Sequence, residues 1–169
     1  MPDKTIKLIV FLLLTFTNTA YALEPTLCKN KETPLFSCAA KNKIISVCSS
    51  KELTLTKGFV TYRFGKNKDT IELEYSSESK DFDKKFKFAS YSYAKGGGAE
   101  LSFKIGKYTY TVYSGSHVYR PNYFGVAVER KSKPTKFINC DKINQHFRPS
   151  LFHIRKAGHK NHEVRGIGS

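Results

Sequence analysis

The sequence has no tryptophan, a single methionine at position 1, and few acidic residues. Its 169 residues contain 14 Asp and Glu against 29 Lys and Arg, so the formal net charge is +15 at pH 7. After the N-terminal segment no apolar run is long enough for a membrane span, which needs roughly 20 apolar residues. The G-x-S-x-G elbow of many serine hydrolases and the C-x2-C pairs of structural zinc sites are also missing. We therefore expect no membrane span after the N-terminal segment, no such hydrolase and no zinc ribbon.

The segment Met1–Ala22 has the composition of a secretory signal peptide. Lys4 and Lys7 precede an apolar stretch, and the segment ends on the small-residue pattern Ala20-Tyr21-Ala22. Threonines and Asn18 interrupt the apolar core too early for a membrane anchor. We therefore predict cleavage after Ala22 and export to the periplasm or the medium.

Four cysteines follow the predicted cleavage point: Cys28, Cys38, Cys48 and Cys140. An even number in an oxidising compartment predicts two disulfides, for which three pairings exist. If a hairpin turns at Lys41-Asn42, Cys38 and Cys48 point to opposite faces and do not face each other. Each would then pair with Cys28 or Cys140, and a bond to Cys140 would connect the first strands to the last.

Apolar and polar residues alternate along most of the remaining chain. In the stretch 59–64, Val60, Tyr62 and Phe64 share one face while Thr61 and Arg63 share the other, as in a half-buried strand. About eight to nine such short segments recur, separated by polar or glycine-containing turns. The sequence predicts a single all-β domain over residues 23–140, an antiparallel β-barrel or sandwich stapled by disulfides. We expect no helix before residue 141 and a polar loop over residues 76–83.

Two local features of the predicted strands need an interpretation. The aromatic residues change parity between Phe88 and Tyr91, which predicts a bulge or a sharp bend. The triple glycine Gly96-Gly97-Gly98 precedes a strand pattern and lacks the Lys-Ser/Thr of a phosphate loop. We interpret it as a flexible bend or a close backbone approach.

The tail, residues 141–169, is basic and loses the alternation. We predict a short helix or an extended arm over residues 142–155 and disorder over residues 158–169. Histidines cluster here, but no carboxylate or cysteine joins them at a fixed spacing, so solvation or adventitious metal binding is the favoured interpretation. We expect neither a metal site nor a cofactor. The histidines of the tail are His146, His153, His159 and His162.

Short motifs spread from Cys28 to Cys140 carry a resemblance to other proteins. They are Phe36-Ser37-Cys38, Ile45-Ser46-Val47-Cys48, Tyr62-Arg63-Phe64-Gly65, Gly96-Gly97-Gly98, the run from Tyr110 to Gly115, Gly125-Val126-Ala127-Val128 and Cys140. Together they resemble a family of small exported bacterial proteins of unassigned function, and this resemblance implies no activity. The architecture is also similar, more distantly, to that of the disulfide-bonded β-barrel lysozyme inhibitors of the bacterial periplasm, and fold alone does not imply function.

The excess of positive charge is the main functional clue in the sequence. Such a charge raises encounter rates with anionic partners, and the pairs Tyr62-Arg63 and Tyr119-Arg120 interleave aromatic rings with cations. Export favours lipid head groups, cell-wall polymers or an acidic protein over nucleic acid. The candidate anion-binding residues lie in predicted loops and in the tail: Lys66, Lys68, Lys95, Lys107, Arg120, Lys131, Lys133, Arg155, Lys156 and Lys160.

Our leading hypothesis is an exported, non-catalytic envelope protein that binds an anionic partner through this basic surface. The alternative is an inhibitor or immunity protein that plugs the active site of a hydrolase with the loop 114–123. Because many lysozymes are themselves basic, charge repulsion counts against that alternative. A third hypothesis is a small hydrolase whose serine, histidine and acid meet only in space, with His117 in a loop; no sequence motif selects such a triad.

Overall fold

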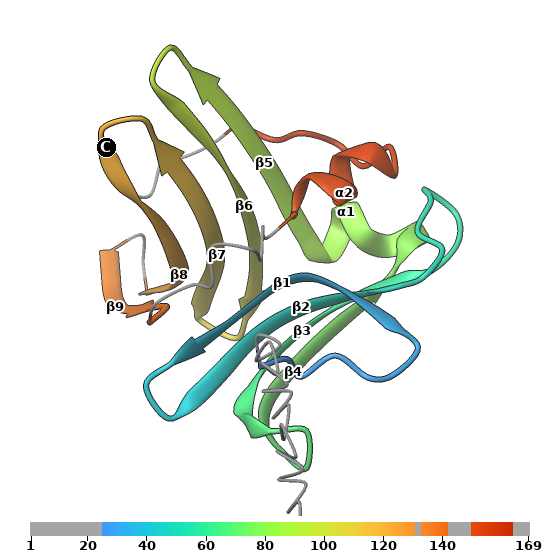
Figure 1. Ribbon diagram of the computed structural model, residues 1–169. Helices are drawn as coiled ribbons and strands as arrows, with labels where there is room; N and C mark the ends of the chain where they lie inside the picture. The colour runs from blue at the N-terminus through green and yellow to red at the C-terminus, as the bar shows by residue number, and fades with distance from the viewer. Residues whose placement is uncertain (1–24, 131–132, 142–149, 164–169) are drawn as a thin grey trace, which may run out of the picture.

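The computed structural model describes residues 25–130, 133–141 and 150–163 (Figure 1). The predicted signal peptide lies outside the described residues. No helix in the described ranges is long and apolar enough to cross a membrane. The strands are β1 (Glu32–Ala40), β2 (Lys43–Ser50), β3 (Phe59–Asn67), β4 (Thr70–Glu78), β5 (Phe86–Tyr93), β6 (Gly96–Ile105), β7 (Tyr108–His117), β8 (Arg120–Arg130) and β9 (Lys133–Asn139).

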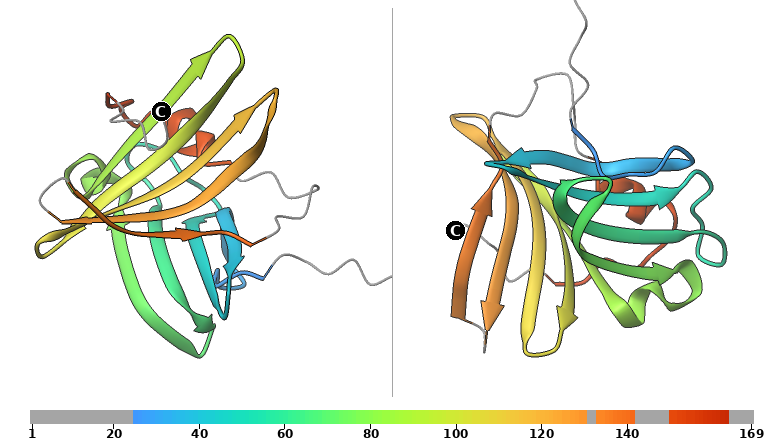
Figure 2. Two further views of the ribbon diagram at one scale, coloured as in Figure 1. Left: turned by 90° about the vertical axis from the view of Figure 1, so that its left-hand side faces the viewer. Right: turned by 90° about the horizontal axis from the view of Figure 1, so that it is seen from below.

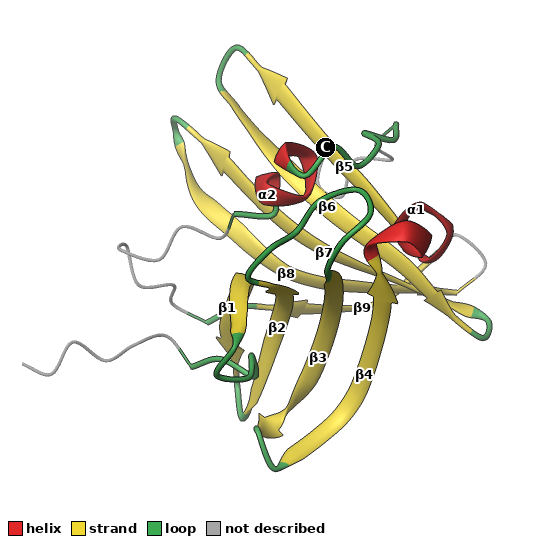
Figure 3. Ribbon diagram, turned by 90° about the vertical axis from the view of Figure 1, so that its right-hand side faces the viewer, coloured by secondary structure: helices red, strands yellow, loops and turns green. Residues whose placement is uncertain are grey.

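The strands form two antiparallel sheets in which each strand pairs with its neighbours in sequence. The first sheet has the order β1-β2-β3-β4 and the second the order β5-β6-β7-β8-β9. The two sheets face each other and cross at a wide angle (Figure 3). The all-β, disulfide-stapled prediction is confirmed. Within the described residues β4 and β5 do not pair, so the sheets stack as an open sandwich and do not close into a barrel.

The core lies between the sheets and is rich in aromatic rings. Phe103 of β6 is 2% exposed, and its ring centroid lies 4.9 Å from that of Tyr62 and 4.8 Å from that of Tyr75, both on the opposite sheet. These contacts use the inward faces that the period-two alternation predicts. Aromatic pairs at this separation add to the free energy gained from burial alone.

The connection from β4 to β5 differs from the predicted polar loop. It contains a 3-10 turn, η1 (Ser79–Asp81), and a one-turn helix, α1 (Phe82–Lys85). Phe82 is fully buried and stacks on Phe86 with ring centroids 5.3 Å apart. The expectation of no helix before the tail was wrong, because burial of this one ring folds the polar residues around it into a turn.

The bulge predicted near Tyr91 is also absent from the described register. β5 and β6 pair without interruption from Phe86 opposite Phe103 to Tyr93 opposite Gly96. The parity change has another cause, which is that β5 carries aromatic rings on both of its faces. Phe86 and Phe88 are buried against the other sheet, and Tyr91 and Tyr93 project from the outer face.

The disulfides are Cys28–Cys48 and Cys38–Cys140. Cys38 pairs in register with Ile45, on the inner face, whereas Cys48 lies three residues further along β2 and faces outward. The predicted opposite orientation of Cys38 and Cys48 is confirmed. Two disulfides are what an oxidising compartment supports.

The C-terminal segment 150–163 is ordered against the sandwich, which corrects the predicted disorder as far as the structure describes this segment. Ser150 N–H donates to Leu35 O of β1, and His162 N–H donates to Phe88 O of β5. Between them lies the short helix α2 (Phe152–Lys156), which overlaps the end of the range 142–155 where a short helix or an extended arm was predicted. Leu151 and Ile154 are fully buried because a spacing of three residues places both on one side of the helix. The segment therefore connects the edge strands of the two sheets, as Figure 3 shows. Residues 142–149 and 164–169 lie outside the described residues.

Candidate functional site

A row of two tyrosines and two glycines crosses the outer face of the five-stranded sheet. Tyr91 pairs in register with Gly98, Gly98 with Gly115, and Gly115 with Tyr123. The two phenol oxygens meet 3.0 Å apart above the glycines. A Cβ at Gly98 would lie 2.6 Å from the Tyr91 oxygen, and one at Gly115 would lie 2.1 Å from Tyr123 Cζ. Glycine is therefore required for both rings to lie across the sheet, and the interpretation of the triple glycine as a close backbone approach is confirmed for Gly98.

A second row lies nearer the ends of the hairpins. Tyr93 pairs with Gly96, which pairs with His117. The Tyr93 ring is 6.2 Å from that of Tyr91 with an interplanar angle of 9°, and it is also 6.2 Å from the imidazole of His117. Tyr91, Tyr93, His117 and Tyr123 thus form an aromatic surface, which we call the tyrosine platform. Burial, followed by the hydrogen bond with Tyr123, raises the pKa of Tyr91, so this phenol remains neutral at physiological pH.

Two hairpin ends border the tyrosine platform, and they are held together by the backbone. Val118 N–H of the β7–β8 hairpin donates to Lys95 O of the β5–β6 hairpin at 2.8 Å. Both hairpins extend beyond the four-stranded sheet (Figures 1 and 2). Val118 and Tyr119 are 71% and 77% exposed. The Lys95 ammonium lies 5.4 Å from the centre of the Tyr119 ring, in cation–π contact.

The charge at these hairpin ends is positive. Lys95 contacts the exposed ring of Tyr119, and Arg120 follows Tyr119 in the chain as the first residue of β8. No ion pair found among the described residues involves either cation. Both were predicted as anion-binding residues, and the structure places them at the same pair of hairpin ends. The arrangement combines exposed aromatic faces with cations that have no carboxylate partner in the described part of the chain.

The other predicted anion-binding residues are spread over the molecule. Lys66 and Lys68 lie at the β3–β4 hairpin, and Lys107 lies in the β6–β7 turn, while the tail residues lie on or after α2. Lys131 and the side chain of Lys133 lie outside the described residues. Those cations of the set whose side chains the structure describes are not gathered into one surface. The tail residues in question are Arg155, Lys156 and Lys160.

A second basic surface was missed in the sequence. A shallow hollow of about 520 Å³ is lined by Lys29, Lys31 and Lys68, together with Glu32. The Glu32 carboxylate is bound by Arg63 at 2.5 Å and is therefore neutralised. The short basic run at Lys29-Asn30-Lys31 could have indicated this hollow, but the irregular pattern before β1 gave no reason to place Lys68 beside it.

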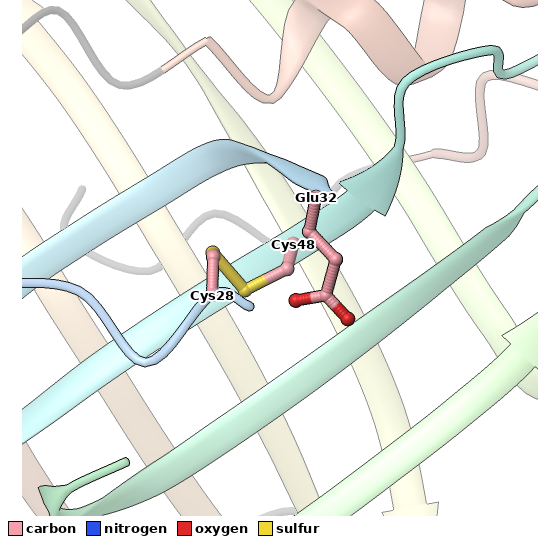
Figure 4. Close-up of side chains that lie close together, drawn as sticks. All are labelled: Cys28, Glu32 and Cys48. Carbon is pink, nitrogen blue, oxygen red and sulfur yellow. A yellow bond between two sulfur atoms is a disulfide. The ribbon is translucent and has the colours of Figure 1, made fainter. Parts of the chain in front are cut away.

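Among the described residues, Cys28, Glu32 and Cys48 form a compact group of potential metal ligands (Figure 4). Both sulfurs belong to one disulfide, and the carboxylate accepts hydrogen bonds from Arg63 and from the Lys29 N–H. The donor atoms of this group are engaged within the protein, so the group is part of the structural framework.

The histidines of the tail do not share one environment. His159 is only 4% exposed, and its ring packs 4.2 Å from that of Phe82. Burial lowers the pKa of His159, an effect that Asp83 partly opposes. His153 lies on the exposed side of α2. The expectation of a solvated histidine cluster was therefore wrong for His159, which is a core residue.

The chain matches no family model, no curated protein and no solved structure.

Proposed function

We propose that the protein is an exported, non-catalytic binding protein that holds an anionic glycan polymer of the cell envelope on the tyrosine platform. The observation that carries this proposal is the combination of the nearly parallel rings of Tyr91 and Tyr93 with the cations Lys95 and Arg120 at the adjoining hairpin ends. Export remains part of the proposal and is supported by the sequence of residues 1–22 and by the two disulfides.

The chemistry of such a polymer fits both halves of this surface. The C–H faces of sugar rings pack on aromatic rings, and the neighbouring rings of Tyr91 and Tyr93 can contact successive sugars. Carboxylate or phosphate groups of the polymer would contact Lys95 and Arg120. The positive charges of these two residues also attract an anion over a distance. The glycines beneath the rings let Tyr91 and Tyr123 lie close against the sheet.

The test is calorimetric titration of the mature, oxidised protein with polygalacturonate, with dextran as the uncharged polymer. We expect binding to polygalacturonate that weakens from low to physiological ionic strength, and little binding to dextran. The double variant Lys95→Gln/Arg120→Gln should lose about tenfold or more in affinity. The matched control, Lys29→Gln/Lys31→Gln, removes the same charge at the other basic hollow and should bind like the parent.

A further variant tests the aromatic half of the surface. Tyr93→Ala removes the more exposed of the two parallel rings and should weaken binding about fivefold, equivalent to about 1 kcal/mol. Equal losses of affinity in Lys95→Gln/Arg120→Gln and in the control Lys29→Gln/Lys31→Gln would indicate a diffuse electrostatic attraction. That result would overturn the proposed site. Absence of binding to polygalacturonate at low ionic strength would overturn it as well.

A second candidate is favoured by one observation, the exposure of Val118 and Tyr119 at the end of a two-residue hairpin turn. The predicted loop 114–123 is largely strand, so that a narrow apolar tip projects from a rigid support. Such a tip suits the inhibitor hypothesis, in which it would enter the active-site cleft of a muramidase. Inhibition of a muramidase at one-to-one stoichiometry, lost in Tyr119→Ser, would support it, and full muramidase activity in excess protein would overturn it.

A further inference from the structure

An apolar cleft of about 420 Å³ lies between the two sheets, on their inner faces and therefore separate from the tyrosine platform. β3 and β4 supply one wall, and β7, β8 and β9 supply the other. The lining residues are Tyr62, Phe64, Leu73, Tyr108, Tyr110, Val128, Lys136 and Ile138.

The cleft exists because the sandwich is filled unevenly. Near the helices, fully buried side chains such as Phe86, Leu151 and Ile154 occupy the space between the sheets. In the cleft, Tyr62 is buried, whereas Phe64 and Leu73 are only partly covered. Tyr110 of the cleft wall stacks on the buried ring of Phe103, with the ring centroids 5.3 Å apart. The walls are therefore mainly apolar, and they remain accessible from outside.

Lys136 is the single charged residue among the described residues that line the cleft. It shares a face of β9 with Ile138, and Phe137 between them is 50% exposed on the other face. The Lys136 side chain is exposed, and it belongs to no ion pair found among the described residues. A second cation is close by, since the Lys107 ammonium lies 6.0 Å from the ring centre of Tyr108, another lining residue.

We propose that this cleft binds a single-chain anionic amphiphile of the fatty-acid class. Its apolar chain would lie between the sheets, and its carboxylate would reach Lys136 at the edge of the cleft. Charge complementarity selects an anionic head group over a neutral or cationic one. The volume lies within the roughly 300–1,000 Å³ range of small-molecule sites. This site is independent of the platform, so either proposal can fail without the other.

The experiment is calorimetric titration of the mature protein, below the micelle concentrations, with dodecanoate, dodecanol and dodecyltrimethylammonium. We expect dodecanoate to bind most tightly and the cation most weakly. Across octanoate, decanoate and dodecanoate, each added methylene should tighten binding about fourfold, equivalent to about 0.8 kcal/mol.

Variants then separate the head-group site from the chain site. Lys136→Gln should weaken dodecanoate about tenfold and leave dodecanol unchanged, because it removes one charge-assisted contact. Lys104→Gln, the same change on the exposed face of β6, should have no effect. Leu73→Trp fills the cleft from a partly exposed position and should abolish binding of both ligands.

Three results would overturn the proposal. The first is equal affinity for all three head groups, and the second is an affinity that does not depend on chain length. The third is dodecanoate binding that persists unchanged in both Lys136→Gln and Leu73→Trp. Far-ultraviolet circular dichroism and the urea midpoint of each variant confirm that it is folded before titration.

Discussion

Cys38 of β1 is bonded to Cys140, 102 residues later, with their Cα atoms 5.7 Å apart. The bond joins an edge strand of the first sheet to the residue that follows the last strand of the second. A backbone hydrogen bond from Asp141 N–H to Ala39 O reinforces the same junction. Since β4 and β5 are joined through η1 and α1, both lateral edges of the sandwich are tied, although the sheets share no ladder.

This pairing predicts unequal contributions of the two disulfides to stability. Chain-entropy estimates give about 5 kcal/mol for a loop of 102 residues and about 3 kcal/mol for the 20-residue loop of Cys28–Cys48. Cys38→Ala/Cys140→Ala should therefore lose more stability than Cys28→Ala/Cys48→Ala. Urea unfolding of the two oxidised double variants measures the difference. A larger loss in the Cys28/Cys48 variant would show that the constraint on the N-terminal segment dominates.

The sequence allowed half of the cysteine pairing to be foreseen. Strand parity requires that Cys38 and Cys48 face opposite ways, and this holds because β1 and β2 keep their register around Lys41. Strand parity could not decide which of these two cysteines forms the disulfide with Cys140. That choice depends on which face of the β1–β2 hairpin packs against the second sheet. Strand alternation reports which residues share a face and leaves the partner of that face unspecified.

Gly115 is predicted to tolerate no side chain while Tyr123 occupies its present position. Gly115→Ala should cost about 1–3 kcal/mol, because its Cβ would overlap the Tyr123 ring. In a Tyr123→Ala background the same glycine change should cost much less, since the overlapping ring is gone. A double-mutant cycle in urea measures this coupling. Additive effects of the two changes would contradict the close approach.

The tyrosine platform was not predicted, although its parts were visible in the sequence. Tyr91 and Tyr93 stand at strand spacing, but their positions over Gly98 and Gly96 follow only from the register of β5 and β6. The approach of Tyr123, which lies over Gly115, depends in addition on the register of β7 and β8. The tail was misjudged for a related reason. Leu151 and Ile154 are too few to signal an amphipathic helix, and their burial depends on a gap between sheets that local sequence does not reveal.

Arg63, on the outer side of the four-stranded sheet, is predicted to be essential for the stability of the protein. It is 3% exposed and contacts Glu32, which is 6% exposed, at 2.5 Å, and Glu74 at 2.6 Å. Arg63→Met should destabilise the protein by about 3–5 kcal/mol, because it leaves the Glu32 carboxylate buried without its partner. Urea unfolding at neutral pH measures the loss.

The companion variant Arg63→Met/Glu32→Leu distinguishes loss of the ion pair from loss of packing. With both charges gone no buried carboxylate remains, so this double variant should be more stable than Arg63→Met alone. Although burial opposes the change, hydrogen bonds from Arg63 and Lys29 lower the pKa of Glu32. The stability from Glu32 is therefore present above the ordinary pKa of about 4.5 and is lost as the pH falls further. A double variant no more stable than the single one would assign the effect to packing.

His159 is predicted to make attachment of the C-terminal segment dependent on pH. Its folded-state pKa is lowered by burial against Phe82, with Asp83 acting in the opposite sense, so the unfolded chain binds the proton more readily. Stability should therefore be full above the ordinary pKa of 6.5 and should decrease as the pH falls through the lowered value. The contribution from Glu32 changes only below about 4.5, so it does not overlap the interval between 6.5 and 4.5 in which the loss caused by His159 should begin.

Hydrogen exchange at the His162 amide provides a local measurement, since this N–H donates to Phe88 O and reports whether the segment is docked on β5. Protection should fall with pH in the parent protein, after correction for the intrinsic exchange rate. His159→Phe keeps an aromatic ring against Phe82 but cannot be protonated, so its protection should not depend on pH over this interval. His153→Gln, at an exposed position on α2, is the matched control and should behave like the parent. If His159→Phe retains the parent's pH dependence, another group must control the docking of the segment.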